Sequence, residues 1–289
     1  MPTVPLVPTL RRRRLGGMLR RLRGDAGVSL ETAAAKMDWH PSKLSRIENA
    51  KAHIRVQSVA PLLNVYGVTD PGVVSALEGL ARDASKTGWW QTYSGVVAPA
   101  YVDYISLESD AESIRTYAPL VVPGLLQTAA YARAVITANA ITRTSVEVAA
   151  LVEVRLARQA VLSRPDRPLK LWAIVEEAVL HRHLPDDPNV MDGQLQRLLE
   201  VSHLPGVTLQ VVPLDAVPHP GGAGAFDLVS FPHPMPGVVE IESLHGSNYV
   251  EGTEDVTLYE SVFNRVSAAA LSEDDSLTLI HRLKKERNA

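Results

Sequence analysis

The stretch from Ser29 to Lys51, SLETAAAKMDWHPSKLSRIENAK, decides the fold of the first part of this chain. It holds two short helical patterns joined by a turn. Ser29 is a favourable N-cap for the first pattern, because its hydroxyl can accept a hydrogen bond from a backbone N–H of the first turn. Ala33, Ala34 and Met37 give that pattern a small apolar face. It therefore predicts a short helix that packs closely against a neighbour.

The second pattern follows a turn at Asp38–His40. Pro41 suits the first turn of a helix, where its missing N–H removes no intrahelical hydrogen bond. Leu44 and Ile47 are spaced to share one face, which we expect to point inward. The outer face then carries polar and cationic side chains, namely Ser42, Lys43, Ser45 and Arg46. A helix of small residues, a tight turn and a helix with such an outer face is the layout of a DNA-reading helix-turn-helix unit.

The charge of the chain is divided unevenly along its length. The whole chain has a net charge of −3. Residues 1–55 hold 12 Lys and Arg against 4 Asp and Glu, a net of +8, which leaves 17 against 28, a net of −11, for residues 56–289. A basic head on an acidic body indicates a phosphate-facing module joined to a part that does not touch DNA. For the basic run Arg11–Arg14 alone, the alternative is the solvated start of a helix.

Composition and length bound the class of protein. A hydrophobic content of 46% over 289 residues is enough for one small and one larger domain, each with its own core. The lack of cysteine excludes disulfides, thiol chemistry and cysteine-based zinc sites, and is typical of a reducing cytosol. The chain shows neither a signal-peptide core nor an apolar stretch near the roughly 20 residues of a membrane span. We expect a soluble cytoplasmic protein.

The first part of the chain has the pattern of a small helical domain. Residues 1–9 are rich in proline and are expected to form a flexible arm. Thr9 is expected to cap a first helix. Residues 10–85 are predicted to form a domain of five short helices, which are the helix-turn-helix pair and three further apolar stripes at 10–25, 56–66 and 71–85.

Beyond a boundary at Thr87–Trp90 the pattern changes. Short runs rich in Val, Ile and Leu and bounded by Pro or Gly indicate strands, and helical stripes alternate with them. Residues 88–289 are therefore predicted to form a mixed α/β or α+β domain, which we expect to bind a ligand or a partner. Thr144 and Glu147 have the spacing of a capping box. The expected strands are 169–175, 208–213, 226–231, 238–242 and 248–251, and the expected helices are 100–118, 125–138, 147–163, 176–183, 191–203, 255–271 and 274–287.

The run Ser42–Asn49, SKLSRIEN, resembles the helix-turn-helix domains of the Xre/Cro family of bacterial and phage repressors. In that family the second helix of the motif lies in the major groove of DNA. The resemblance implies base contacts by Ser42 and Arg46, phosphate contacts by Lys43 and Lys51, and a structural role for Glu48. The candidate DNA-contacting residues are His40, Ser42, Lys43, Ser45, Arg46 and Lys51.

Arg46 is the side chain best suited to read a base. A guanidinium group can donate two hydrogen bonds to O6 and N7 of guanine, whereas a lysine that contacts phosphate adds affinity without sequence information. The alternative for Arg46 is a solvated arginine paired with a nearby carboxylate. Trp39 is expected to pack the turn rather than to contact DNA. The residue after the first cap is often Gln in the family and is Leu30 here, so the resemblance implies no DNA contact at this position.

An ordered string of motifs extends the resemblance over nearly the whole chain. It is similar to the actinobacterial WhiJ-like regulators, which place an Xre helix-turn-helix domain before a C-terminal domain of unknown activity. The resemblance implies an antitoxin-like or developmental regulator that is often encoded beside a small partner protein. The motifs are Trp89-Trp90, Leu107-Glu108, Val122–Thr128, Tyr131–Arg133, Arg155-x-x-Arg158-Gln159 and Glu176–Leu180.

Five polar residues of the second part are candidates for a ligand or partner site. Arg155 and Gln159 lie four apart, and therefore on one face of a helix that also carries Arg158. Glu176 and Glu177 follow a strand, and the ends of strands are where ligands bind in α/β sheets. The alternative is a buried Arg–Glu pair that orders the domain. No motif marks a nucleophile or a general base, so no catalytic residue is expected.

Two further patterns invite a ligand and are better explained without one. His181 and His183 are two apart, so on a helix they point in different directions and suit a metal poorly. The run Gly221–Gly224 lacks the Gly-Lys-Ser/Thr ending of a phosphate-binding loop and is predicted to be a hairpin or a loop leading into a strand. We expect neither a metal nor a cofactor.

These patterns predict a sequence-specific DNA-binding transcriptional regulator that is not an enzyme. Its partner is double-stranded DNA. A homodimer is expected, because one short recognition helix reads too few base pairs to select a site in a genome. One alternative is an antitoxin-like protein that sequesters a small partner, encoded by an adjacent gene, and regulates its own operon. A second alternative is an enzyme domain tethered to DNA.

Overall fold

The computed structural model describes residues 9–84, 89–93, 95–139, 143–184, 187, 189–243 and 246–287. The predicted arm, apart from Thr9, and residues 85–88 at the predicted boundary lie outside them. The chain divides into two compact units. The first comprises residues 1–91 and 232–235, and the second comprises residues 92–231 and 236–289. The predicted fold class is confirmed, since a helical helix-turn-helix region precedes a mixed sheet covered by helices.

The helices of the first unit follow the apolar stripes of its sequence. The Ser29 hydroxyl accepts a hydrogen bond from Thr32 N, so the predicted cap is present. Thr9 stands at the N-cap position of the first helix, but its side chain makes no capping bond. The stripe at 56–66 begins with a 3-10 turn and becomes α-helical at Val59. The helices are α1 (Leu10–Asp25), α2 (Leu30–Lys36), α3 (Pro41–Glu48), α4 (Val59–Val65) and α5 (Pro71–Asp83).

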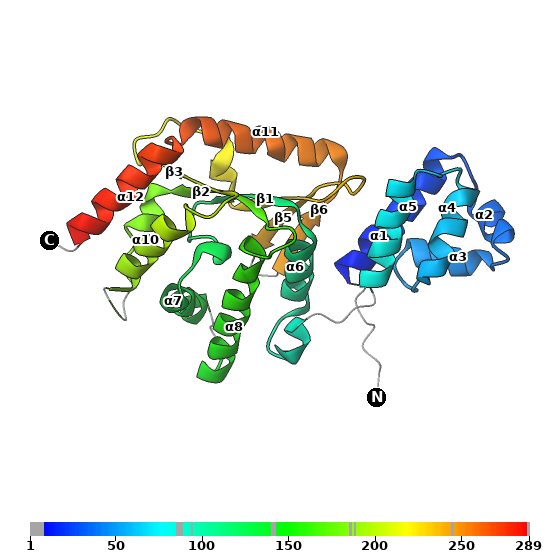
Figure 1. The fold of residues 1–289 in the computed structure, drawn as a ribbon, viewed down its shortest axis with the longest axis horizontal. Coiled ribbons are helices and arrows are strands. Elements are labelled where there is room, and N and C mark those ends of the chain that lie inside the picture. The colour runs from blue at the N-terminus through cyan, green and yellow to red at the C-terminus, as the bar shows by residue number, and fades with distance from the viewer. Residues whose placement is uncertain are drawn as a thin grey trace. The chain divides into compact units, whose positions relative to one another are not determined.

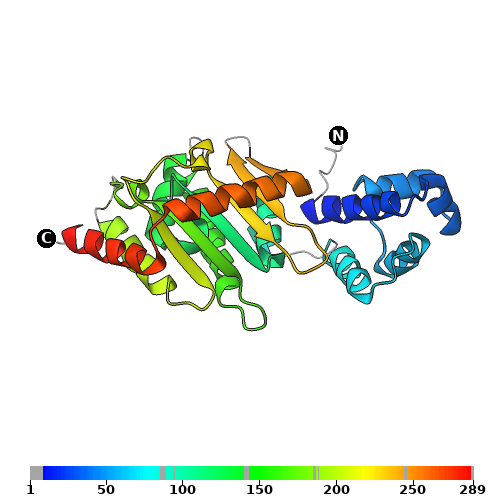
Figure 2. The ribbon, with the colours of Figure 1, turned by 90° about the horizontal axis from the view of Figure 1, so that it is seen from above.

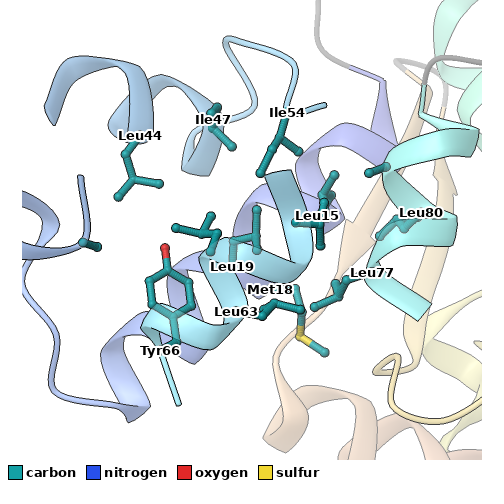
Figure 3. Close-up of a cluster of buried hydrophobic side chains, with 14 of the residues drawn as sticks. Leu15, Met18, Leu19, Leu44, Ile47, Ile54, Leu63, Tyr66, Leu77 and Leu80 are labelled. Carbon is teal, nitrogen blue, oxygen red and sulfur yellow. The ribbon is translucent and has the colours of Figure 1, made fainter. Parts of the chain in front are cut away.

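One hydrophobic core joins these helices, as Figure 3 shows. Leu19, Leu44 and Leu63 come from different helices, and each is fully buried. Burying one such side chain stabilises the fold by about 1.5–3 kcal/mol. Because Leu44 and Ile47 of α3 point into this core, the opposite side of α3 is left at the surface (Figure 3).

The second unit is built on a mixed six-stranded sheet with the strand order β3-β2-β1-β4-β5-β6. The first three strands are parallel, and the last three run antiparallel to their neighbours. The strands are β1 (Ser113–Ala118), β2 (Lys170–Glu176), β3 (Val207–Val212), β4 (Phe226–Ser230), β5 (Val238–Ser243) and β6 (Gly246–Val250).

Helices cover both faces of this sheet (Figures 1 and 2). The first face packs on α11 through Phe263 and Val266, and α12 lies against β3 and α10. No helix in the described part is both long and apolar enough to cross a membrane. The bounds are α11 (Thr253–Ala269) on the first face, α6 (Pro99–Asp110), α7 (Ala129–Asn139), α8 (Ser145–Arg158) and α10 (Asn189–Val201) on the opposite face, α12 (Glu273–Arg287), and a single turn, α9 (Glu177–Leu180).

The central strand β1 was not expected, and the prediction of one helix over residues 100–118 is wrong. The helix α6 ends at Asp110, and the chain re-forms as a strand at Ser113. Ile114 and Thr116 point to one face and Tyr117 to the other, and β1 has hydrogen-bonded neighbours on both sides. Burial on both faces removes the polar–apolar alternation by which a strand is recognised.

Three other predicted helices are shorter than expected. The helix predicted over 125–138 begins only at Ala129, after a 3-10 turn, and Thr128 Oγ1 accepts a hydrogen bond from Tyr131 N at its start. The helix predicted over 176–183 is only the single turn α9. Glu176 still belongs to β2, and the turn ends at Leu180. The capping box at Thr144 is confirmed and starts α8 at Ser145, but α8 gives way to a 3-10 turn after Arg158.

Candidate nucleic-acid interface and polar sites of the second unit

The two faces of α3 differ as the sequence predicts. Leu44 and Ile47 are buried in the core. Ser42, Lys43 and Arg46 are exposed, and Ser45 is half-buried. The candidate residues His40 and Lys51 are also exposed, on either side of the helix. The helix therefore offers a row of polar and cationic groups to a ligand outside the unit.

His40 holds the beginning of α3. Its Nδ1 atom accepts a hydrogen bond from Ser42 N at 3.2 Å and lies 2.7 Å from Ser42 Oγ. Because the backbone N–H is a donor, Nδ1 must be the unprotonated ring nitrogen. Pro41 occupies the first turn, where no N–H is needed. His40 is thus the N-cap of α3, a structural part that the sequence pattern did not assign to it.

Several outward side chains of α3 are held by contacts inside the motif, whereas Arg46 is not. Asn49 Nδ2 donates to the carbonyl oxygen of Ser45 at 2.8 Å. The ammonium of Lys43 lies 4.0 Å from the ring centroid of Trp39. Within the described residues, the Arg46 guanidinium makes no hydrogen bond, and no carboxylate oxygen lies within 4.0 Å of it. Its donors are therefore available to a base or a phosphate.

The end of α3 is anchored to α1 and α4. Arg23 donates to both carboxylate oxygens of buried Glu48, at 2.7 and 2.9 Å, and Tyr66 Oη donates to the same carboxylate at 3.4 Å. The hydrogen bonds from Arg23 to Glu48 raise the pKa of Arg23. A Cβ atom on Gly16 would stand 2.7 Å from the carbonyl oxygens of both Ile47 and Glu48, so α1 can approach α3 closely only at a glycine.

The anchoring residues Arg23 and Tyr66 were not found by sequence reasoning. Glu48 itself carries a signal, since it directly follows the buried Ile47 and lies four residues after the buried Leu44. A carboxylate at such a position needs a partner. The sequence does not say which cation supplies it.

The arginines of the basic run at the start of α1 are largely buried in the first unit or in contact with its other residues. Arg14 is buried. The Arg12 guanidinium lies 2.5 Å from His53 Nε2, and burial, with the charge of Arg12 as a second cause, lowers the pKa of His53. Arg11 lies over the ring of Trp90, with its guanidinium carbon 5.8 Å from the ring centroid. The run is thus neither a freely solvated helix start nor a fully open set of phosphate contacts.

In the second unit, Arg158 forms a buried ion pair with Glu108 of α6. Its Nε and Nη2 atoms donate to the two carboxylate oxygens at 2.9 and 2.6 Å, and Nη1 donates to Tyr101 Oη at 2.5 Å. Burial raises the pKa of Glu108, against the opposing effect of Arg158. Arg158 therefore belongs to the interior of the unit and does not meet Glu176 or Glu177.

Arg155 and Gln159 tie down the loop before α7. Arg155 Nη1 donates to Gln127 Oε1 at 3.0 Å, and Gln159 Nε2 donates to the carbonyl oxygens of Gly124 and Gln127 at 3.2 and 2.7 Å. Gln127 is buried. Arg155 and Gln159 therefore both contact Gln127, which lies in a loop that sequence reasoning predicted to be helical.

Glu176 and Glu177 lie at the carboxyl end of β2, where two histidines join them. Tyr117 Oη donates to Glu176 Oε1 at 2.6 Å, and His219 Nε2 lies 3.3 Å from the same oxygen. Burial, together with the hydrogen bond to Glu176, raises the pKa of Tyr117. Glu177 accepts a hydrogen bond from Leu214 N at 3.0 Å and lies 3.1 Å from His181 Nε2. Sequence reasoning did not include Tyr117 or His219 in this group.

The loop from Pro220 shapes the same edge of the sheet. It is a 3-10 turn that leads into β4, as predicted for the glycine run. Gly221 N donates to His219 Nδ1 at 3.2 Å, so the proton of a neutral His219 is on Nε2 and faces Glu176. A Cβ atom on Gly221 would stand 2.6 Å from the ring of Tyr117. In the described part of the chain, no three His, Asp or Glu side chains are placed to hold a metal.

A row of polar residues crosses the opposite face of the sheet, under α6. Thr116, Asp227, Glu240 and Tyr249 are register partners on β1, β4, β5 and β6. Tyr104 of α6 donates a hydrogen bond to Asp227. This row adds two carboxyl groups to the buried Glu108 and Arg158 pair.

Comparison with known proteins gives two family matches. A model described as "Domain of unknown function (DUF5753)" matches residues 101–282, and a model described as "Helix-turn-helix domain" matches residues 14–77. No curated protein matches the chain. No solved structure matches it. The helix-turn-helix match covers α2 and α3 and indicates a DNA-binding regulator.

Proposed function

The chain belongs to the DUF5753 family, and we propose that it is a transcriptional regulator that binds specific DNA sequences through α3. The observation that carries the proposal is the division of α3 into two faces. Leu44 and Ile47 fix the helix in the core, and Arg46 extends from the other face with no partner among the described residues. A guanidinium placed in this way can donate two hydrogen bonds to guanine in the major groove.

The charge of the chain supports the same proposal. Residues 1–55 carry a net charge of +8. A head of this charge attracts DNA phosphates, and the counterions that it releases make binding weaker as the salt concentration rises. A homodimer belongs to the proposal because one α3 reads few base pairs, and two helices one turn of DNA apart read enough to select a site.

The second unit is proposed to act on DNA binding indirectly, through a ligand or a partner protein. The second unit holds 15 Lys and Arg against 25 Asp and Glu, a net charge of −10, which repels phosphates. Glu176 and His219 gather at the carboxyl ends of the parallel strands β1 and β2, where ligands bind in sheets of this kind. We assign no catalytic residue to this edge.

The proposal is tested with the full chain and a binding site selected from a random DNA library. Arg46→Ala should weaken binding to the selected site by about 1–3 kcal/mol and change binding to random DNA little, because only base contacts carry sequence information. Arg133→Ala, which removes an exposed arginine of α7, is the matched control and should change neither. If no sequence is enriched from the library, or if the two variants behave alike, the proposal is wrong.

A further inference from the structure

Trp39 and Lys43 form a pair at the start of α3 that the proposed function does not yet use. The Lys43 ammonium lies 4.0 Å from the centroid of the Trp39 ring. A cation at this distance over an indole is attracted by the negative face of the ring. Among the described residues, no carboxylate oxygen lies within 4.0 Å of this ammonium. The ring is thus the observed partner of the Lys43 charge.

The position of the Trp39 ring is fixed by the backbone turn before it and by packing against the core. Asp38 has a φ of 54°, which turns the chain sharply after α2. Trp39 N then donates to the carbonyl oxygen of Ala34 at 2.9 Å, and the half-buried ring packs against the core of the first unit. Lys43, in contrast, is exposed and has a long, flexible side chain. Such a side chain loses conformational freedom when it is fixed on a ligand.

We propose that Trp39 is a positioning residue for DNA binding, whose ring holds the Lys43 ammonium beside the first turn of α3 for contact with a DNA phosphate. The inference rests on the proposed function. Trp39 need not touch DNA itself, and part of the entropic cost of fixing Lys43 is met before DNA binds. A phosphate contact carries no sequence information, so the effect should be the same on specific and on random DNA.

A double-mutant cycle on the full chain tests this. Affinities for a 30-base-pair duplex carrying the selected site, and for a random duplex of equal length, are measured for Trp39→Leu, Lys43→Ala and the double variant. Trp39→Leu should weaken binding to both duplexes about two- to fivefold, which is the range expected for part of the cost of immobilising one long side chain. It should cause no further loss in the Lys43→Ala background. Trp39→Phe keeps an aromatic face and should restore most of the affinity.

Other outcomes would overturn the inference. An equal loss from Trp39→Leu in both backgrounds means that Trp39 acts through packing alone. Tighter binding by Trp39→Leu means that the ring withholds the lysine from DNA. Melting temperatures identify a variant that fails to fold, and in that case Trp39→Met, which also lacks an aromatic ring, replaces Trp39→Leu in the cycle. A parent chain that binds neither duplex contradicts the proposed function itself, whereas binding without coupling contradicts only the role of Trp39.

Discussion

Asp227 of β4 and Glu240 of β5 stand directly opposite each other in the sheet, with both carboxyl groups on the face that α6 covers. Glu240 is buried. Burial, and then the charge of Asp227, raises the pKa of Glu240 to about 8, and burial also raises the pKa of Asp227. The groups that face this pair include Arg158, Glu108, Tyr104, Thr116, Ser247 and Glu242. Burial and the neighbouring carboxylate therefore favour the protonated form of Glu240.

The second unit should lose stability as the pH rises from about 5 to 8. In the unfolded chain Glu240 ionises near its ordinary pKa of 4.5, while in the folded chain it keeps its proton up to a pH of about 8. The free energy of unfolding then falls by up to about 1.4 kcal/mol per pH unit over this window. Glu240→Gln should flatten the fall, measured by urea unfolding at several pH values. Glu254→Gln, on an exposed residue of α11 that does not face this pair, should leave it unchanged. A steep fall that persists in Glu240→Gln would assign the effect to another group.

Gly16 and Gly17 are neighbours in α1 and should respond oppositely to alanine. At Gly16 a Cβ atom meets the carbonyl oxygens of Ile47 and Glu48 at 2.7 Å, whereas at Gly17 it meets nothing within 4 Å. Gly16→Ala should cost about 1–3 kcal/mol, because α1 must move away from α3. Gly17→Ala should stabilise the unit by about 0.5–1 kcal/mol through helix propensity. Thermal unfolding of both variants checks the prediction, and equal shifts would mean that α1 and α3 are not in close contact.

Removing the cation of the Arg158–Glu108 pair should cost far more stability than removing the cation of the pair of Lys170 and Glu112. Arg158 and Glu108 side chains are 5% and 1% exposed, whereas those of Lys170 and Glu112 are 71% and 47% exposed, with 4.0 Å between their charged atoms. Arg158→Met leaves a carboxylate buried without its cation and should cost about 3–5 kcal/mol. Lys170→Met should cost about 0–1 kcal/mol. Urea unfolding distinguishes the two, and a small effect of Arg158→Met would show that Glu108 simply takes up a proton.

The first unit could be predicted from sequence because its signals are local. Apolar residues at helical spacing place α1 and α4, and Ser29 and Pro41 mark the starts of α2 and α3. The strand β1 could not be placed in this way. Its short segment follows α6 without an intervening glycine or proline, and its identity depends on pairing with β2 and β4, which lie far along the chain.

The same limit applies to the candidate functional residues: sequence could place those set by local periodicity but not those brought together by the fold. Helical periodicity alone puts Arg46 opposite Leu44 and Ile47. It cannot show that Glu108 is the partner of Arg158, or that His219 joins Glu176, because loops and strands bring these residues together. Sequence reasoning grouped Arg158, on a polar helix, with Glu176, at the end of a strand, whereas the fold places them on opposite faces of the sheet.

The position of β1 in the strand order delays completion of the second unit during synthesis. The helices of the first unit contact near neighbours along the chain, and units of this kind fold fast. The central strand β1 lies between β2 and β4, so it gains its second neighbour only when residues 226–230 have been made. Domains fold from the N-terminus as the chain emerges. We expect the helices α1 to α5 to be folded while the ribosome is still making the sheet, and residues 232–235 to join the first unit only after β4 has been made.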